Sequence, residues 1–244
     1  MIKFDVITLF PQLFTEHLNN LPFKKAQKKK IAKYKLWNLR DFTTNSYGSV
    51  DDKTYGGGVG MILMIEPIFK ALEKIYGKKE MGRIIKSRNR EKENYKDKKT
   101  GKDKRIILLS PRGKTYTQEK ARELAKCDQI TIICGRYEGV DSRIEESIAT
   151  DVISIGDYVL SGGEIASLAI LESITRILPG VLEKSEAQEI ESFSDNDLKS
   201  IEYPQYTKPE EFKGLKVPDI LLSGNHKEIE KWRKDNSRKS GKEI

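Results

Sequence analysis

The sequence predicts an α/β protein built on a parallel sheet, because apolar runs suited to buried strands alternate with stretches of helical spacing. The expected strands are Phe4–Phe10, Lys35–Leu39, Arg105–Ser110, Gln129–Cys134 and Asp151–Ile155. The expected helices between or after them are Glu66–Tyr76, Gln118–Lys126, Ser142–Ala149 and Glu164–Leu178. Ligands of such sheets bind beyond the carboxyl ends of the strands, so the loops there form the candidate site.

Three loops at that edge are rich in glycine or small polar residues. They follow the last three expected strands and comprise Ser110–Gly113, Gly135–Gly139 and Gly156–Gly163. Loops at one edge of a parallel sheet converge on one crevice, so we expect a single site. Each loop taken alone is equally compatible with an ordinary turn.

Local signals also predict where two of the helices begin and end. Thr117 is the expected N-cap of the helix that starts at Gln118. Pro179-Gly180 is the expected end of the last helix of the α/β region, because neither residue favours continued helix.

The balance of charge favours a polyanionic partner. Lys and Arg outnumber Asp and Glu by 45 to 37 among 244 residues, which gives a formal net charge of +8. A Lys or Arg beside a phosphate releases condensed counterions, so a basic protein gains affinity for nucleic acid. Charge alone does not separate such a protein from basic proteins with other roles.

The amino-terminal segment and the cysteine content predict a cytoplasmic protein with no membrane attachment. Residues 1–10 lack the long apolar run of a signal peptide, and no stretch approaches the length of a membrane span. Cys127 and Cys134 are the only cysteines, and their spacing fits neither a disulfide framework nor a zinc motif. We expect both to be reduced and buried.

Two segments differ in composition from the rest. Gly77–Lys104 is dense in charged residues and poor in apolar ones, so we expect a mobile surface insertion in preference to an RNA-gripping arm. Leu182–Ser200 is acidic and rich in serine, which is typical of a linker that becomes ordered only with a ligand. A short second domain follows, with a basic helix around Glu230–Lys234.

A fourth glycine-rich loop spans Val50–Gly60. Its glycines let the backbone approach a ligand closely, but it matches neither a Walker motif nor a dinucleotide fingerprint. The adjacent carboxylates of Asp51 and Asp52 suit a metal ion or the edge of a base. On these residues alone, a flexible turn is an equal alternative.

Seven motifs follow one another along the chain: VDDKTYGGGVGM, LSPRG, CGRYEGVDSR, SIGDYVLSGGE, RILPGVL, YPQYTKPEEF and LLSGNHKEIEKWR. In this order they resemble the bacterial tRNA (guanine-N1-)-methyltransferases of the SPOUT class. The resemblance implies a parallel sheet with a deep trefoil knot, S-adenosylmethionine and Mg²⁺ as cofactors, and tRNA as partner. It also implies a homodimer with active sites at the subunit interface, and no membrane. The implied domains are a catalytic domain of residues 1–182, a linker of residues 183–200 and a small helical domain of residues 201–244.

The same resemblance assigns roles to individual residues. Arg176 matches the catalytic arginine of the family, and Glu191 matches the position of its catalytic carboxylate. On the substrate side the matching residues are Asp51, Tyr55, Gly57 and Gly58. The cofactor would be held by Ser110, Pro111, Gly113, Gly135, Tyr137, Glu138, Ser154, Ile155, Gly156, Asp157, Tyr158, Val159, Leu160, Gly162 and Gly163.

The implied reaction is methylation of N1 of guanine-37, the guanine just 3′ of the anticodon. N1 bears a proton, so it becomes nucleophilic only when a general base removes that proton. A guanidinium near O6 stabilises the negative charge that develops. We therefore expect Glu191 to act as the base and Arg176 as the partner of O6.

The chain departs from the family at two places. Many relatives have Asp where this chain has Glu191, so the carboxylate is retained on a longer side chain. The family continues past the tryptophan helix with a basic segment, whereas this chain stops at Asn236–Ile244. We expect a truncated small domain, with either weaker tRNA binding or compensation by the Lys-rich insertion.

Two other functions stay open on the sequence. A sister SPOUT enzyme that acts on ribosomal RNA or on a ribose oxygen would not need a carboxylate base at Glu191. A non-catalytic relative would bind cofactor and RNA without transferring a methyl group.

Overall fold

A computed structural model defines the fold of residues 1–43, 47–88, 103–182, 191–194 and 200–239. The chain divides into two compact units, Met1–Leu182 and Glu183–Ile244. Within the residues that the structure describes, no helix combines the length and apolar character needed to cross a membrane.

A five-stranded parallel sheet forms the centre of the first unit. Its strands are β1 (Ile2–Thr8), β2 (Ala32–Asn38), β5 (Lys104–Thr115), β6 (Gln129–Ile133) and β7 (Asp151–Ser154). Their spatial order is β2-β1-β6-β5-β7, and every neighbouring pair is parallel. The predicted parallel sheet is confirmed, with strand ends that differ by a few residues.

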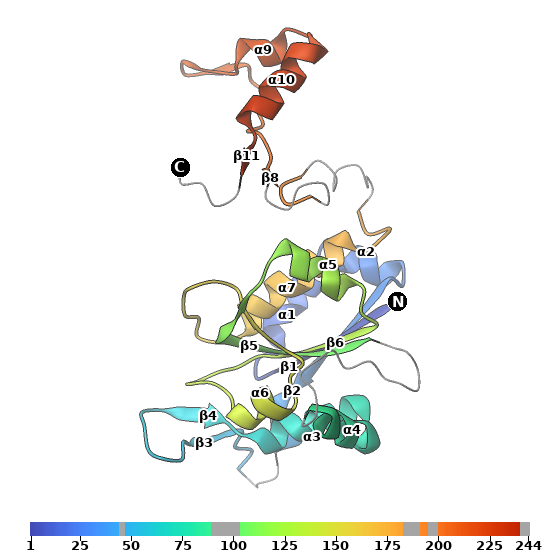
Figure 1. Cartoon of the computed structure of the whole chain (residues 1–244), viewed down its shortest axis with the longest axis vertical. Coiled ribbons are helices and arrows are strands. Elements are labelled where there is room, and N and C mark those ends of the chain that lie inside the picture. The colour runs from blue at the N-terminus through green and yellow to red at the C-terminus, as the bar shows by residue number, and fades with distance from the viewer. Residues whose placement is uncertain (44–46, 89–102, 183–190, 195–199, 240–244) are drawn as a thin grey trace. The chain divides into compact units, whose positions relative to one another are not determined.

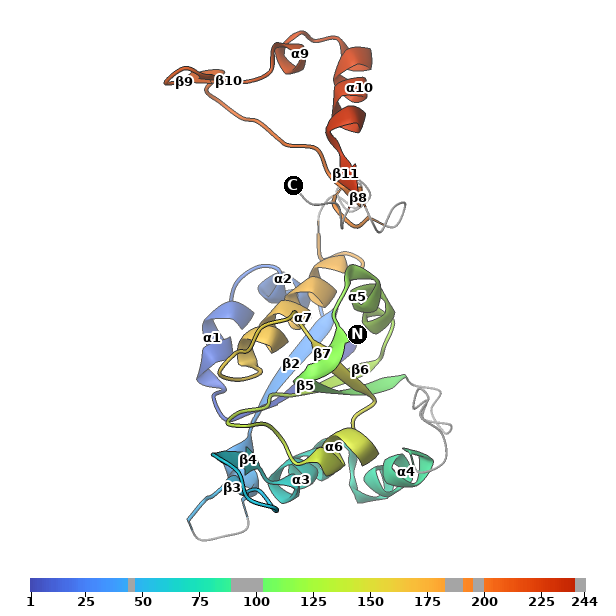
Figure 2. The same cartoon turned by 60° about the vertical axis from the view of Figure 1, so that its left-hand side comes forward.

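Helices cover both faces of this sheet (Figures 1 and 2). One face carries α1 (Gln12–Leu18), α2 (Phe23–Lys28), α5 (Gln118–Ala125) and α7 (Glu164–Ile177). The other face carries α3 (Ile65–Tyr76), α4 (Lys78–Arg88) and α6 (Ser142–Ser147). Helices α1 and α2 were not predicted, because a single buried residue in α1 and two in α2 give no helical period.

The predicted helix boundaries are confirmed at both positions. The hydroxyl of Thr117 accepts a hydrogen bond from the backbone N–H of Lys120 at 3.2 Å, which caps α5. Helix α7 ends at Ile177, directly before Leu178 and Pro179.

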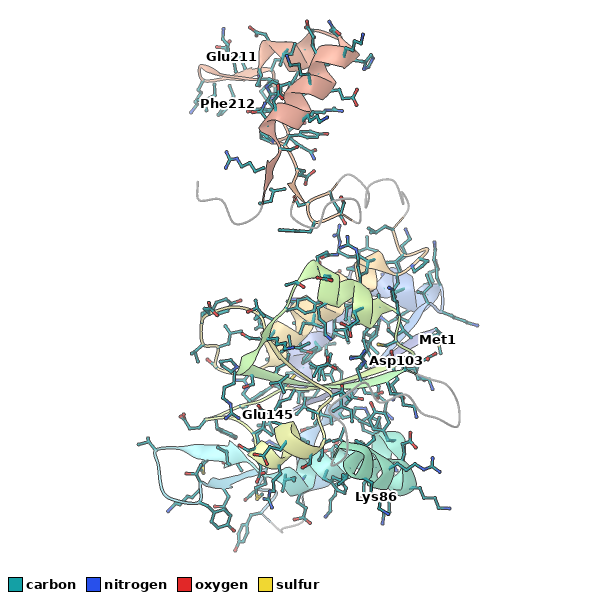
Figure 3. All side chains as sticks on the ribbon, viewed as in Figure 1. Met1, Lys86, Asp103, Glu145, Glu211 and Phe212 are labelled. Carbon is teal, nitrogen blue, oxygen red and sulfur yellow. The ribbon has the colours of Figure 1, made fainter. Side chains whose placement is uncertain are left out.

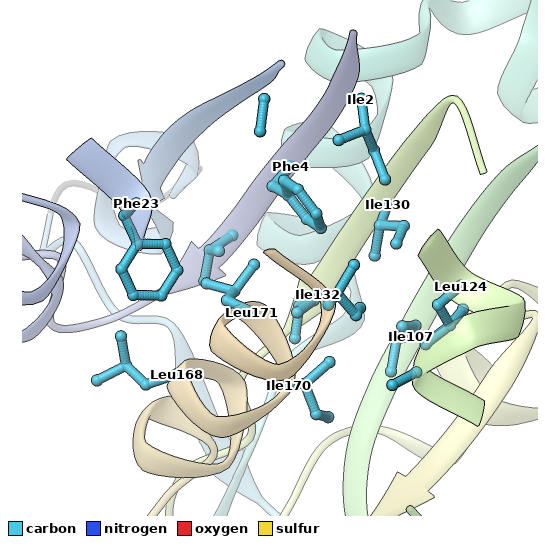
Figure 4. Close-up of a cluster of buried hydrophobic side chains, with 14 of the residues drawn as sticks. Ile2, Phe4, Phe23, Ile107, Leu124, Ile130, Ile132, Leu168, Ile170 and Leu171 are labelled. Carbon is cyan, nitrogen blue, oxygen red and sulfur yellow. The ribbon is translucent and has the colours of Figure 1, made fainter. Parts of the chain in front are cut away.

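The core lies in two layers, one on each face of the sheet. Figure 4 shows Phe4, Ile130 and Ile132 of the sheet facing Ile170 and Leu171 of α7. The alternate residues of the same strands pack against α3 and α4 on the other side. Because both faces are covered, the central strands contain apolar runs such as residues 106–109 of β5, which explains why they stand out in the sequence.

Helix α4 corrects the prediction for the charged segment Gly77–Lys104. Met81 and Ile84 of α4 are buried in the core, and the ammonium group of Lys104 lies 3.1 Å from the carboxylate of Glu80. The spacing of three residues puts both apolar side chains on one helical face. These two side chains are therefore enough to pack α4 against the core. The rest of the segment, residues 89–102, lies outside the described residues.

The described part of the second unit contains α9 (Asp219–Leu222), α10 (His226–Asn236) and two pairs of short strands. These pairs are β8 (Ser200–Ile201) with β11 (Arg238–Lys239) and β9 (Glu211–Phe212) with β10 (Leu215–Lys216). Trp232 of α10 packs against the rings of Tyr203 and Tyr206, with centroids 6.4 and 6.3 Å apart. The predicted basic helix is therefore confirmed, held by an aromatic cluster. Most of the predicted linker lies outside the described residues.

Candidate functional site

A cavity of about 560 Å³ lies beyond the carboxyl ends of β5, β6 and β7. This volume falls within the range of small-molecule sites, about 300–1,000 Å³. The three glycine-rich loops converge on it, as the parallel strand order requires. Of the residues predicted to hold a cofactor, the lining includes Ser110, Pro111, Gly135, Tyr137, Glu138, Ser154, Ile155, Gly156, Tyr158, Val159, Leu160, Gly162 and Gly163.

Two of the predicted cofactor residues, Gly113 and Asp157, do not line the cavity. Gly113 instead lies against the backbone of β7, where an added Cβ would sit 2.5 Å from the nitrogen of Ile153. Within β5, the chain crosses β7 between Leu109 and Lys114, because both of these residues pair with Ile153, and pairing continues at Thr115 with Ser154. The structure therefore gives Gly113 a role in backbone crossing.

Gly163 joins two of the loops at the floor of the cavity. Its N–H donates a hydrogen bond to the carbonyl oxygen of Gly135 at 2.9 Å. An added Cβ at Gly163 would lie 2.9 Å from the Cα of Cys134, which is backbone that cannot rotate away. Only glycine lets the loops after β6 and β7 approach this closely.

An ion pair between Arg136 and Glu164 supports the wall of the cavity. Glu164 begins α7 and is 1% exposed, and its carboxylate accepts a hydrogen bond from Arg136 Nε at 2.9 Å. The hydroxyl of Thr8, at the end of β1, donates to the same carboxylate at 2.8 Å. Arg136 itself lines the cavity, donates to the carbonyl of Ser161 at 3.3 Å and lies over the ring of Phe10 at 4.5 Å.

Arg136 and Glu164 lie in the sequence motifs, but no role in the site was predicted for either. The one signal was an acidic residue at the start of a helix rich in apolar residues, because acidic residues are rarely fully buried without a partner. The partner is 28 residues away, so no local pattern identifies it.

Both cysteines are buried and free, as predicted. Burial raises the pKa of the Cys134 thiol well above its ordinary value, and the nearby negative charge of Glu164 raises it further. Burial also raises the pKa of Cys127 to about 12. Both thiols are therefore protonated at neutral pH and are poor nucleophiles.

The Val50–Gly60 loop forms a hairpin beside the cavity. Its strands are β3 (Asp51–Lys53) and β4 (Met61–Leu63). Thr54 and Ile62 of the hairpin line the cavity. The predicted substrate residues do not line it, and they are Asp51, Tyr55, Gly57 and Gly58.

The two predicted catalytic residues also lie off the cavity lining. Helix α7 begins beside the cavity at Glu164, and Arg176 follows twelve residues later. At 1.5 Å per residue, this places Arg176 about 18 Å along the helix. Glu191 belongs to the second unit.

In the described parts of the chain, no group of three or more His, Cys, Asp or Glu is arranged to hold a metal ion.

Comparison with known proteins identifies relatives along nearly the whole chain. The model of the family described as tRNA (Guanine-1)-methyltransferase TrmD matches residues 2–243. A tRNA (guanine-N(1)-)-methyltransferase from Bacillus cereus (strain AH820) is 44% identical over 236 residues, which cover 97% of this chain and 87% of that protein. The crystal structure of tRNA (m1G37) methyltransferase from Aquifex aeolicus is similar with a TM-score of 0.70 and 36% identity, over 95% of this chain and 87% of that one. The chain therefore belongs to the tRNA (guanine-1)-methyltransferase family.

Proposed function

We propose that the protein acts in the cytoplasm and transfers a methyl group from S-adenosylmethionine to N1 of guanine-37 in tRNA. The observation that carries this proposal is the cavity formed by the three motif loops. Membership of the family and the name of the similar Aquifex aeolicus structure support the choice of tRNA and of this guanine.

The residues of the cavity fit S-adenosylmethionine. Ile155, Val159 and Leu160 offer apolar surface for the adenine ring, and Glu138 offers a carboxylate for hydroxyl groups. The glycine-rich backbone offers N–H donors for polar edges. When bound, this molecule supplies a methyl group on a positively charged sulfur.

Residues of the chain itself would prepare the guanine. The carboxylate of Glu191 accepts the N1 proton and becomes neutral, which leaves the lone pair of N1 free to attack. The negative charge shared by N1 and O6 is stabilised by the guanidinium of Arg176. Alignment of N1 with the methyl group supplies much of the remaining rate.

We infer a homodimer from the position of Arg176. About 18 Å of helix separates this residue from the end of α7 that borders the cavity. A second subunit could bring the far end of its own α7 to the cavity of the first. The site would then be complete only at the subunit interface.

We also infer that the first unit carries the trefoil knot of the SPOUT class. The last part of β5 crosses β7 at Gly113, and the segment after β7 returns to the end of β6 at Gly163. These two crossings support a knot in which α7 passes through the loop formed by the preceding chain. Stretching the unfolded chain from its ends should give a contour shorter than that of an unknotted chain.

A requirement for Mg²⁺ stays a prediction. EDTA is expected to abolish methyl transfer, and added Mg²⁺ is expected to restore it. Full activity after removal of divalent ions would contradict the requirement.

The decisive experiment measures methyl transfer to unmodified tRNA transcripts that differ only at position 37. We expect 1-methylguanosine only with guanine-37, and losses of kcat of about 10²–10³-fold in Glu191→Ala and Arg176→Ala. Binding of S-adenosylmethionine should be unchanged in both, because neither side chain lines the cavity. Transfer to ribosomal RNA or to a ribose would favour a sister enzyme, and binding without transfer would favour a non-catalytic relative.

A further inference from the structure

The net positive charge of the chain comes from one short segment. Residues 17–40 contain seven Lys, one Arg and no Asp or Glu. The other 220 residues contain 37 basic and 37 acidic residues, so this segment carries the whole formal net charge of +8. A general excess of lysine would have been spread along the chain.

The segment forms α2, the following turn and β2 at one edge of the sheet. Phe23 and Ala26 bury one side of α2, whereas Lys24, Lys28 and Lys30 are exposed. Among the described residues, no carboxylate pairs with any of these three ammonium groups. We call Lys24, Lys28 and Lys30 the α2 lysine cluster.

The end of α2 and strand β2 lie beside the end of α7 that carries Arg176. The ammonium group of Lys29 donates a hydrogen bond to the carbonyl oxygen of Gly180 at 2.9 Å. The hydroxyl of Tyr34 on β2 lies 2.7 Å from the hydroxyl of Thr175, the residue before Arg176. Figure 2 shows α2 alongside α7. The helix that carries the cluster therefore packs against the helix that carries the proposed catalytic arginine.

Effects on the stability of the fold explain only some of the lysines in this segment. Lys28 in the last turn of α2 is favoured by the helix dipole, and a lysine on the edge strand β2 discourages sheet pairing. Neither effect applies to Lys24 or Lys30. Moreover, Lys24 and Lys28 are four residues apart on one helix, where like charges destabilise the helix slightly.

We propose that the α2 lysine cluster binds the phosphodiester backbone of tRNA beside the target guanine. The inference rests on the proposed function, because it is the placement of Arg176 that brings RNA to this end of α7. Phosphates carry the charge opposite to that of exposed ammonium groups. The counterions released when the two meet give affinity without selecting a base sequence. The cluster would thus hold the anticodon arm while Arg176 and Glu191 act on the base.

The test compares two triple variants with the same change of charge. Lys24→Gln, Lys28→Gln and Lys30→Gln neutralise the α2 lysine cluster. Lys78→Gln, Lys79→Gln and Lys86→Gln neutralise three exposed lysines of α4, on the opposite face of the sheet. Figure 3 shows Lys86 pointing away from the sheet. Thermal unfolding and cofactor binding of each variant establish that fold and cavity are intact.

For the α2 variant we expect the Kd for tRNA to rise about tenfold near 0.15 M salt. The slope of log Kobs against log salt should become shallower by about 0.7–0.9 for each phosphate that the variant no longer neutralises. The reduction in affinity should be equal for tRNAs with guanine or adenine at position 37, and kcat at saturating tRNA should be unchanged. The α4 variant should retain the affinity and slope of the unmodified protein.

An unchanged Kd and slope in the α2 variant would overturn the proposal, as would equal reductions of affinity in both variants. Reduced binding to phosphatidylserine vesicles with undiminished tRNA binding would overturn it in favour of a membrane surface. If the unmodified protein methylates guanine-37 while the α2 variant behaves normally, only this inference fails. If the unmodified protein transfers no methyl group to tRNA, the proposed function itself fails.

Discussion

A few residues at the floor and wall of the cavity hold its loops together. Arg136 lies in the loop after β6 and Glu164 begins α7, and the hydroxyl of Thr8 donates a hydrogen bond to the same carboxylate. Removing one partner of a buried ion pair leaves the other charge unpaired, which costs more than an exposed pair contributes. The shape of the cavity therefore depends on Glu164 and Thr8, although neither residue lines it.

We expect Glu164→Gln to weaken S-adenosylmethionine binding by at least about tenfold and to lower the free energy of unfolding by about 1–3 kcal/mol. The amide offers one acceptor oxygen to two donors, so the loop that carries Arg136 loses its anchor. Calorimetric titration and urea unfolding measure the two effects. The matched control is Glu66→Gln, which removes an exposed pair with Lys70 and should change neither. Equal affinity in both variants would contradict the anchoring role.

Gly163 allows a second test at this scale. Gly163→Ala places a Cβ against the backbone of Cys134, so the loops must separate and cofactor binding should be abolished. Gly82→Ala in α4 is the control, because no atom lies within 4 Å of an added Cβ there. Alanine should stabilise that helix by about 0.5–1 kcal/mol. Retained cofactor binding in Gly163→Ala would contradict the close approach.

At the scale of elements, a charge cluster ties the start of β7 to β5 and α5. Arg105 is 4% exposed and lies 3.3 Å from the carboxylate of Asp151. The ammonium group of Lys120 lies 2.6 Å from the same carboxylate. Burial by itself raises the pKa of Asp151, but the hydrogen bonds from Lys120 and Thr150 and the two positive charges bring it below its ordinary value of 3.8.

A lowered pKa in the folded state means that ionised Asp151 stabilises the fold at neutral pH. This contribution is complete above the unfolded pKa and is lost as the pH falls through the lower folded value. Asp151→Asn should therefore lower the free energy of unfolding by about 1–3 kcal/mol at pH 7. The difference between variant and parent should shrink below about pH 3.8. A difference that is constant with pH would show that the charge is not responsible.

At the scale of the whole molecule, the proposed dimer predicts complementation between defective subunits. An Arg176→Ala subunit keeps an intact cavity, and a Gly163→Ala subunit keeps an intact Arg176. Each variant alone should be inactive. When equal amounts are denatured and refolded together, half of the dimers are mixed and contain one native site. The mixture should recover about one quarter of full activity, and no recovery would contradict a site shared between subunits.

The elements that the sequence predicted correctly are those whose signal is local. Strands buried on both faces are continuous apolar runs, and Thr117 and Pro179 act on the helix ends next to them. Helix α4 was missed because its charged residues dominate the composition. Its two core residues, Met81 and Ile84, are informative only once the sheet face that they cover is known.

Three features could be read from the amino-acid sequence alone. They are the alternation of strands and helices, the chemistry of the three loops and, through seven ordered motifs, the resemblance to the family. These features depend on neighbouring residues or on their order. Three features could be seen only in the folded chain. Gly113 is a crossing point, Arg136 meets Glu164, and the end of α2 lies beside the end of α7. Contacts between residues far apart in the chain arise from packing, and packing leaves no period in a sequence.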